Sequence, residues 1–244
     1  MAGPRRSKSS AFMTTTFQAF KDRIVGDLLP TFCDDPSRRW GCGGFKEDWK
    51  NITEKDAADF LLSLDAGLIE HQGGGFYKAP KSLGAGEQFF WSGKKSVSPR
   101  PITLWVEPII TVAVLSRLHF KWGWPRELIG TQSRKWQFDV TAYRASDPNN
   151  EYEACEVKKT VAELDQLVEL MQRFSRDRDA GDTLKSSKEI NAFRKLKGLQ
   201  ERHASIFWAV GPNGASKVFR MTYTDGGAVI FKSASDDALT YSGA

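Results

Sequence analysis

Two carboxylates and one lysine, namely Asp139, Glu156 and Lys158, are the residues of this sequence whose types and spacing best suit chemistry. A hard divalent cation such as Mg²⁺ prefers oxygen ligands and commonly takes one or two carboxylates, with substrate phosphate and water completing the octahedron. A lysine at the same place would hold or activate the attacking water and stabilise charge on the phosphate. Together these groups predict Mg²⁺-dependent hydrolysis of a phosphodiester bond, with Mn²⁺ able to substitute. The alternative is a purely structural ion pair between Asp139 and Lys158.

Two neighbouring strands must bring these side chains together. Strands are expected at 136–144 and 151–159, and Asp-Pro-Asn-Asn at 147–150 is typical of a turn between them. In an antiparallel hairpin the numbers of paired residues add up to a constant, here about 295 to 297. This register places Asp139 opposite Glu156 to Lys158.

Alternation along the second strand decides which side chains face the same way. Glu156 and Lys158 share one face, and Lys159 points away from Lys158. Cys155 should lie with Val157 on the opposite, apolar face, which predicts a buried thiol and not a nucleophile.

This pattern resembles a known signature. Asp139 followed by Glu156-Val157-Lys158 at the end of the next strand is similar to the Asp-Xn-(Asp/Glu)-X-Lys motif of the PD-(D/E)XK nuclease superfamily, which has the restriction-endonuclease-like fold. Phe138 stands where the name of the motif has a proline. The resemblance covers about residues 105–210 and implies a Mg²⁺-dependent endonuclease acting on DNA, with Asp139, Glu156 and Lys158 as its catalytic residues.

Two further residues match the family by position. Branches similar to archaeal Holliday-junction resolvases and Mrr-type restriction enzymes carry a metal-site glutamate on the helix before the first strand, where Glu107 lies, so the implied metal ligands are Glu107, Asp139 and Glu156. Several branches carry a glutamine on the helix after the lysine strand, where Gln166 lies, and Gln166 is therefore expected at the nucleic acid. The alternative is a catalytically inactive nuclease-fold protein that binds nucleic acid or assembles a larger complex.

The remaining elements predict an α/β fold with a mixed sheet flanked by helices. Helices follow from apolar spacing and capping residues, and strands from alternation and bounding glycines. Helices are expected at 17–29, ending at Pro30, then after the cap Thr53, at 105–121, and from the cap Thr160 to Phe174; further strands are expected at 68–72, 76–79, 127–131, 204–210, 217–224 and 228–232.

Composition shifts divide the chain into three parts. A polar leader at 1–16 is expected to be disordered. A small, mainly helical domain follows at 17–96, for which a winged-helix domain and a helical packing or dimerisation domain are the two interpretations. The segment 80–103 has no sustained periodicity, and the nuclease domain is expected at 97–244.

Charge favours a polyanionic partner. The chain of 244 residues has a formal net charge of +5, and residues 94–135 contain eight basic and two acidic residues. Arg134, Lys135 and Lys159 are expected to contact DNA, with Gln166. Trp122 and Trp124 would stack on unpaired bases or, as the favoured alternative, lie in the core.

Other function classes are disfavoured. The sequence has neither a P-loop nor a GxGxxG after a strand, which argues against a nucleotide cofactor. Its apolar stretches are too short to span a membrane, and three scattered cysteines predict no disulfide framework. These features predict a cytoplasmic protein, with homodimer formation open.

Overall fold

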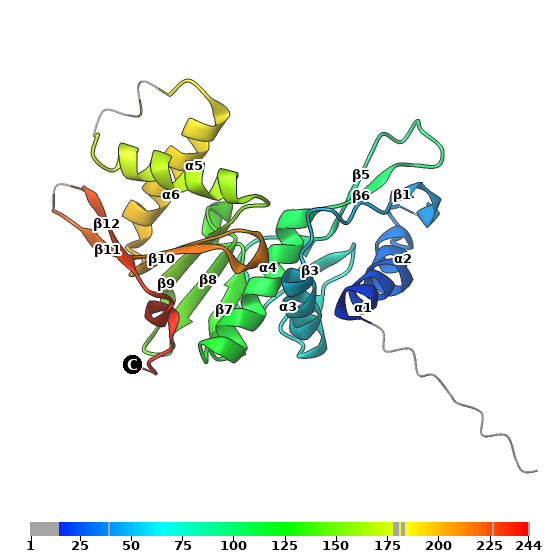
Figure 1. Cartoon of the computed structure of the whole chain (residues 1–244), viewed down its shortest axis with the longest axis horizontal. Coiled ribbons are helices and arrows are strands. Elements are labelled where there is room, and N and C mark those ends of the chain that lie inside the picture. The colour runs from blue at the N-terminus through cyan, green and yellow to red at the C-terminus, as the bar shows by residue number, and fades with distance from the viewer. Residues whose placement is uncertain (1–14, 39, 178–180, 182–183, 226, 244) are drawn as a thin grey trace, which may run out of the picture.

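The computed structural model describes residues 15–38, 40–177, 181, 184–225 and 227–243, and its architecture is α/β. At its centre is a six-stranded sheet with the order β12-β11-β10-β9-β8-β7 (Figure 1). β9 and β10 are parallel and the other neighbouring strands are antiparallel, which confirms the expected mixed sheet. The strands are β7 (Ile129–Thr131), β8 (Val140–Arg144), β9 (Asp147–Val157), β10 (Ile206–Val210), β11 (Ser216–Tyr223) and β12 (Val229–Ala234).

The β8–β9 hairpin has the expected register but not the expected turn. Val140 pairs with Cys155 and Ala142 with Glu153, so that each pair adds up to 295. The turn predicted at 147–150 is wrong, because the chain turns at 145–146 and β9 already begins at Asp147. Irregularities in the pairing near Tyr143 absorb the extra residues of β9, as a β-bulge does, and restore the register toward Asp139.

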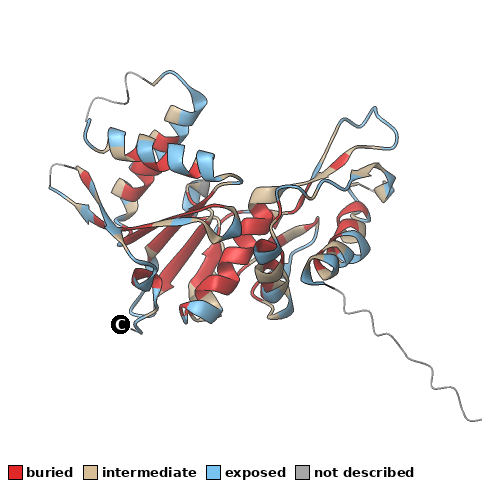
Figure 2. Ribbon diagram, viewed as in Figure 1, coloured by how far each residue is buried: buried red, intermediate tan, exposed pale blue. Residues whose placement is uncertain are grey.

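Helices cover both faces of this sheet (Figure 1). α5 (Val161–Phe174) and α6 (Ser187–Arg202) form one apolar cluster with Phe207 and Ala209 of β10. α4 (Val106–Ser116) belongs to the cluster on the other face, with Cys155 and Val157 of β9, so Cys155 is buried as predicted. Figure 2 shows α4 as a buried helix, which its apolar sequence explains.

The N-terminal helices differ from expectation at Pro30. α1 (Thr16–Arg23) is followed by a π-helical turn (Ile24–Leu28) and by α2 (Leu29–Cys33). Pro30 therefore does not end the helical run; it is the second residue of α2, directly after the π-helical turn. Of the leader expected at 1–16, residues 1–14 lie outside the described residues and Thr15 caps α1.

The segment between α2 and α4 contains more strands than its sequence predicts. α3 (Glu54–Asp65) begins at the predicted cap Thr53. The rest of this segment forms two three-stranded sheets, with the orders β2-β3-β4 and β1-β6-β5. Their strands are two or three residues long, too short to show a period in the sequence: β1 (Phe45–Lys46), β2 (Glu70–His71), β3 (Phe76–Lys78), β4 (Glu87–Gln88), β5 (Phe90–Ser92) and β6 (Ile102–Leu104).

Contacts join this N-terminal segment to the central sheet. One hydrophobic cluster contains Phe60 of α3 and Val112 of α4, on the two sides of the expected boundary at 97. The side chains of Asp56 and Arg117 form a buried ion pair of 2.6 Å between α3 and the π-helical turn (Arg117–Lys121) that continues α4. At Gly130 of β7 the backbone of Lys81 comes so close that a Cβ atom would lie 2.4 Å from it.

Short 3₁₀ helices complete the described structure at Cys42–Gly44, Arg126–Leu128, Arg134–Trp136, Pro212–Gly214 and Asp236–Leu239. In the described part of the chain, no helix is both long and apolar enough to cross a membrane.

Candidate functional site

Asp139 is held directly before β8 by the neighbouring end of β9. Its backbone N–H donates to the carbonyl of Cys155 at 2.9 Å, which extends the hairpin ladder. Its carboxylate Oδ2 accepts a hydrogen bond of 2.7 Å from the N–H of Val157. The backbone thus orients the Asp139 carboxylate toward the end of β9, as the predicted register requires.

Glu156 is buried between two lysines. Lys158 Nζ lies 2.7 Å from one carboxylate oxygen of Glu156 and donates to the carbonyl of Val157 at 2.8 Å. Lys195 Nζ, from the middle of α6, lies 2.5 Å from the other carboxylate oxygen. Glu156 therefore forms ion pairs with Lys158, which the sequence placed on the same face, and with Lys195, which was not predicted.

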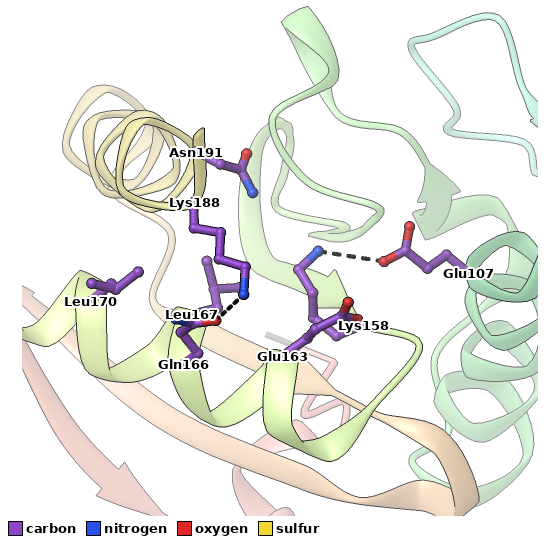
Figure 3. A pocket seen from close by; sticks show the side chains of 8 residues that line it. All are labelled: Glu107, Lys158, Glu163, Gln166, Leu167, Leu170, Lys188 and Asn191. Carbon is purple, nitrogen blue, oxygen red and sulfur yellow. Dashed lines mark hydrogen bonds and ion pairs between the residues drawn. The ribbon is translucent and has the colours of Figure 1, made fainter. Parts of the chain in front are cut away.

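Glu107 completes the group from the first turn of α4. Its carboxylate lies 3.9 Å from Lys158 Nζ, and the two side chains point toward each other across a cavity (Figure 3). α5 and α6 form the other walls of this cavity, which has a volume of about 190 Å³. Gln166 lines it from α5 and accepts a hydrogen bond of 2.7 Å from Lys188 of α6. The structure thus brings Gln166 to the same cavity as Glu107 and Lys158.

A second cavity adjoins the first at Glu107. It has a volume of about 270 Å³ and is lined by Asp139, Glu107 and Trp105, with Glu87 of β4. Glu87 is buried, although it belongs to a segment whose sequence shows no periodicity. A third carboxyl group, absent from the prediction, therefore faces the same cavity as Asp139 and Glu107.

Burial raises the pKa of three of these carboxyl groups. Burial and the charge of Glu156 raise the pKa of Asp139 to about 7. Burial and the charge of Asp139 raise the pKa of Glu87 to about 8. Burial also raises the pKa of Glu107, although Lys158 opposes the shift. These groups therefore bind protons more readily than free carboxylates do.

In the ion pair of Glu156 and Lys158, the pKa values shift so that both charged forms are favoured. Burial disfavours the charge on Glu156, but the ammonium groups of Lys195 and Lys158 outweigh it and lower the pKa of Glu156. Burial likewise disfavours the charge on Lys158, and the Glu156 and Asp139 carboxylates outweigh it and raise the pKa of Lys158. Lys158 is therefore an ammonium at neutral pH.

Two carboxyl groups of this site, Asp139 and Glu107, could hold a hard cation. The two cavities and the ion pairs beside them contain four carboxyl groups and two lysines: Glu87, Glu107, Asp139 and Glu156, and Lys158 and Lys195. Among the described residues, no group of three or more His, Cys, Asp and Glu side chains is arranged to hold a metal ion. Mg²⁺ needs only one or two carboxylates with water and substrate phosphate, and Asp139 and Glu107 line one cavity.

The basic residues expected at DNA lie at different distances from the site. Lys159 is exposed beside Lys158 and pairs with Glu163 at 3.7 Å. Arg134 and Lys135 are exposed near the C-terminal end of α6, where Lys135 Nζ lies 4.0 Å from Glu201. Neither Arg134 nor Lys135 lines the two cavities described above.

The tryptophans expected at unpaired bases are core residues. Trp122 and Trp124 are both buried, and the indole N–H of Trp124 donates to the carbonyl of Leu239 at 2.7 Å. The stacking interpretation of Trp122 and Trp124 is therefore wrong, and the alternative, that both lie in the core, is confirmed.

Two residues of the candidate site, Lys195 and Glu87, were not predicted from the sequence. Lys195 occupies an apolar position of α6, between Ala192 and Leu199, and a charged residue on a buried stripe is the signal that would have found it. Glu87 carries no such signal, because β4 is only two residues long.

Comparison of the chain with protein-family models, with curated proteins and with solved structures gave no significant match.

Proposed function

We propose that this protein is a Mg²⁺-dependent endonuclease that hydrolyses phosphodiester bonds of DNA, with a restriction-endonuclease-like fold. The observation that carries the proposal is the meeting of Asp139, Glu156 and Lys158 from two strands with Glu107 from α4. Among the described residues, Lys158 pairs with Glu156 and Glu107 and forms no ion pair with Asp139, so the purely structural Asp139–Lys158 pair is not supported.

Each residue has a defined part in this reaction. A water molecule attacks phosphorus, the bond from phosphorus to the leaving oxygen breaks, and the proton of the water passes to solvent or to the leaving oxygen. Asp139 and Glu107, which line one cavity, would hold Mg²⁺, which when bound would neutralise phosphate charge and lower the pKa of water. Glu156, paired with Lys158 and Lys195, would hold Lys158 in place beside them. Lys158, as an ammonium, stabilises the charge that develops on the phosphate.

Lys195 favours the alternative, a nuclease-fold protein that binds nucleic acid or assembles a complex without cleaving. Both oxygens of Glu156 already have ammonium partners, Lys158 and Lys195, so Glu156 carries less free charge for a cation. In this alternative the ion pairs of Glu156 would stabilise the fold, and the site would bind no metal ion.

Nicking of supercoiled plasmid separates the two functions. Wild type with Mg²⁺ or Mn²⁺ is expected to convert plasmid to the nicked or linear form, and chelation is expected to stop the reaction. Asp139→Asn should lose this activity, whereas Asp147→Asn, an exposed control at the other end of the same hairpin, should keep it. Salt-dependent DNA binding without nicking in either metal would select the alternative.

DNA contacts are proposed for Lys159 and Gln166 beside the site and for Arg134 and Lys135 at the end of α6. The winged-helix interpretation of 17–96 gains no support from α3, because Asp56 and Asp59 pair with Arg117 of the neighbouring helix. We propose a role in DNA engagement or in homodimer formation for this segment, with the protein acting in the cytoplasm.

A further inference from the structure

The β5–β6 hairpin carries two exposed tryptophans. Figure 1 shows β5 and β6 extending away from the central sheet as an arm. Trp91 on β5 is 59% exposed and Trp105, directly after β6, is 47% exposed. Indole rings are large and apolar, so two of them in solvent on one arm are a feature that needs an explanation.

The pairing of the arm places both rings on one face. Trp91 pairs with Thr103, and Trp105 follows Thr103 by two residues in extended conformation, with its N–H donating to Phe89 at 2.8 Å. Residues two apart on a strand point the same way, so Trp91 and Trp105 are diagonal neighbours, a relation that aromatic side chains span. The alternate residues Phe90 and Ile102 are buried on the opposite face.

The arm is basic and internally braced. The residues from Gln88 to Val106 include three basic residues and no carboxylate. The side chain of Arg100 donates to the carbonyl of Gly93 at 2.8 Å and lies 3.8 Å from the ring centroid of Trp40. It therefore joins the two ends of the loop between β5 and β6 and connects them to Trp40. Lys94 and Lys95 are exposed at the beginning of the loop between β5 and β6, and they have no ion-pair partner among the residues that the structure describes.

The face of the arm leads to the candidate active site. Trp105 lines the same cavity as Asp139, Glu107 and Glu87. A chain lying along Trp91 and Trp105 would therefore reach the cavity that these carboxylates line.

We infer that the β5–β6 arm is a binding site for unpaired nucleobases of DNA, which stack on Trp91 and Trp105 while Lys94 and Lys95 contact the phosphates. Aromatic side chains combined with basic residues are the usual means of holding single-stranded nucleic acid. The inference rests on the proposed function and narrows its substrate class to DNA with a single-stranded segment beside the cleavage point.

Binding of labelled oligonucleotides, measured by fluorescence anisotropy in chelator so that nothing is cleaved, tests the arm separately from catalysis. Wild type is expected to bind a single strand, and a duplex with a single-stranded tail, more tightly than a blunt duplex. Trp91→Ala should weaken binding to the single strand about tenfold or more, with little change for the blunt duplex. Trp91→Phe keeps an aromatic face and should retain most of the affinity.

Phe120→Ala is the matched control, because Phe120 is an equally exposed aromatic residue on the π-helical turn after α4. It should bind all three DNAs as wild type does, and thermal melting should show that each variant is folded. Replacing Lys94 and Lys95 together by Ala should reduce the slope of log K against log salt for single strands by about 1.4.

The outcomes separate the two proposals. Equal affinity of Trp91→Ala and wild type for the single strand would overturn the arm as a base-stacking site, as would an equal loss for single strand and blunt duplex. Self-association of wild type that Trp91→Ala abolishes, without any effect on DNA, would assign the arm to a second copy of the chain instead. If wild type does not nick plasmid but binds single strands through Trp91 as expected, the proposed nuclease function is contradicted and the inference about the arm stands.

Discussion

At the scale of single residues, Lys158 and Lys159 are adjacent and identical in type but differ in surroundings. Lys158 lies 2.7 Å from Glu156 and faces Glu107, whereas Lys159 is exposed and pairs with Glu163. We expect Lys158→Ala to bind DNA with near-normal affinity but to cleave it at least about a hundredfold more slowly, since one preorganised charge typically contributes about 10²- to 10³-fold in rate.

Lys159→Ala is the control for this prediction and should cleave within a few-fold of wild type. The measurements are single-turnover cleavage rates and anisotropy titrations on the same DNA. Equal rate losses in both variants would contradict the specific role of Lys158 in catalysis. Full activity of Lys158→Ala would contradict the proposed nuclease mechanism.

Glu153 offers a prediction of pH dependence that does not involve catalysis. It is buried on the α4 face of β9, and neither of its carboxylate oxygens has a hydrogen-bond partner among the described residues. Burial raises the pKa of Glu153 well above its ordinary value. The folded state therefore holds the proton to higher pH than the unfolded state, and the free energy of unfolding falls as pH rises from the unfolded pKa toward the folded one.

Glu153→Gln mimics the protonated acid and removes this loss. We expect the variant to match wild type in urea unfolding at pH 5 and to be more stable than wild type at pH 8. A difference in stability between variant and wild type that is the same at both pH values would show that Glu153 keeps its charge in the fold.

At the scale of elements, a buried ion pair joins α3 to the end of α4. Asp56 is fully buried and bonds to Arg117 at 2.6 Å, while its other oxygen accepts from the N–H of Asn213 at 2.8 Å. Arg117→Ala would leave Asp56 buried without its counter-charge. We expect a loss of about 3–5 kcal/mol in the free energy of unfolding, measured by urea denaturation.

The matched control is Arg23→Ala, because Arg23 pairs with Asp65 of the same helix α3 at 3.0 Å, but on the surface. Exposed pairs contribute about 0–1 kcal/mol, so this variant should lie close to wild type. A comparable loss in both variants would mean that burial does not govern the Asp56–Arg117 pair.

At the scale of the whole molecule, metal binding at the proposed site should stabilise the fold. A ligand at ten times its Kd adds about 1.4 kcal/mol to the free energy of unfolding. For a chain of this size that corresponds to a rise in Tm of about 3 to 6 °C. We expect Mg²⁺ or Mn²⁺ to produce such a rise in wild type, because a cation relieves the repulsion among Asp139, Glu107 and Glu156.

Asp139→Asn should lose much of this rise, and the exposed control Asp147→Asn should keep it. Differential scanning fluorimetry with and without metal gives both values. An unchanged rise in Asp139→Asn would exclude Asp139 from the metal site and would direct attention to Glu87 and Glu107.

What the sequence by itself determined is local in origin. Alternation along β9 and the hairpin register bring Asp139 to Glu156 and Lys158, and both depend only on residues within about twenty positions. The caps at Thr53 and Thr160 also begin helices where predicted, because a cap bonds to backbone two or three residues away. Even the misplaced turn did not disturb the site, since the register shifts lie between Ala142 and the turn, and the pairs next to Asp139 keep the predicted register.

Only the tertiary structure decided which residues complete the site and which aromatics face solvent. Lys195 reaches Glu156 across 39 positions, and Glu87 meets Asp139 only because β4 lies beside α4. Trp124 is buried and Trp91 is exposed, although neither lies in a periodic segment long enough to assign a face. Contacts between distant segments depend on how whole elements pack, and no local period in the sequence records that packing.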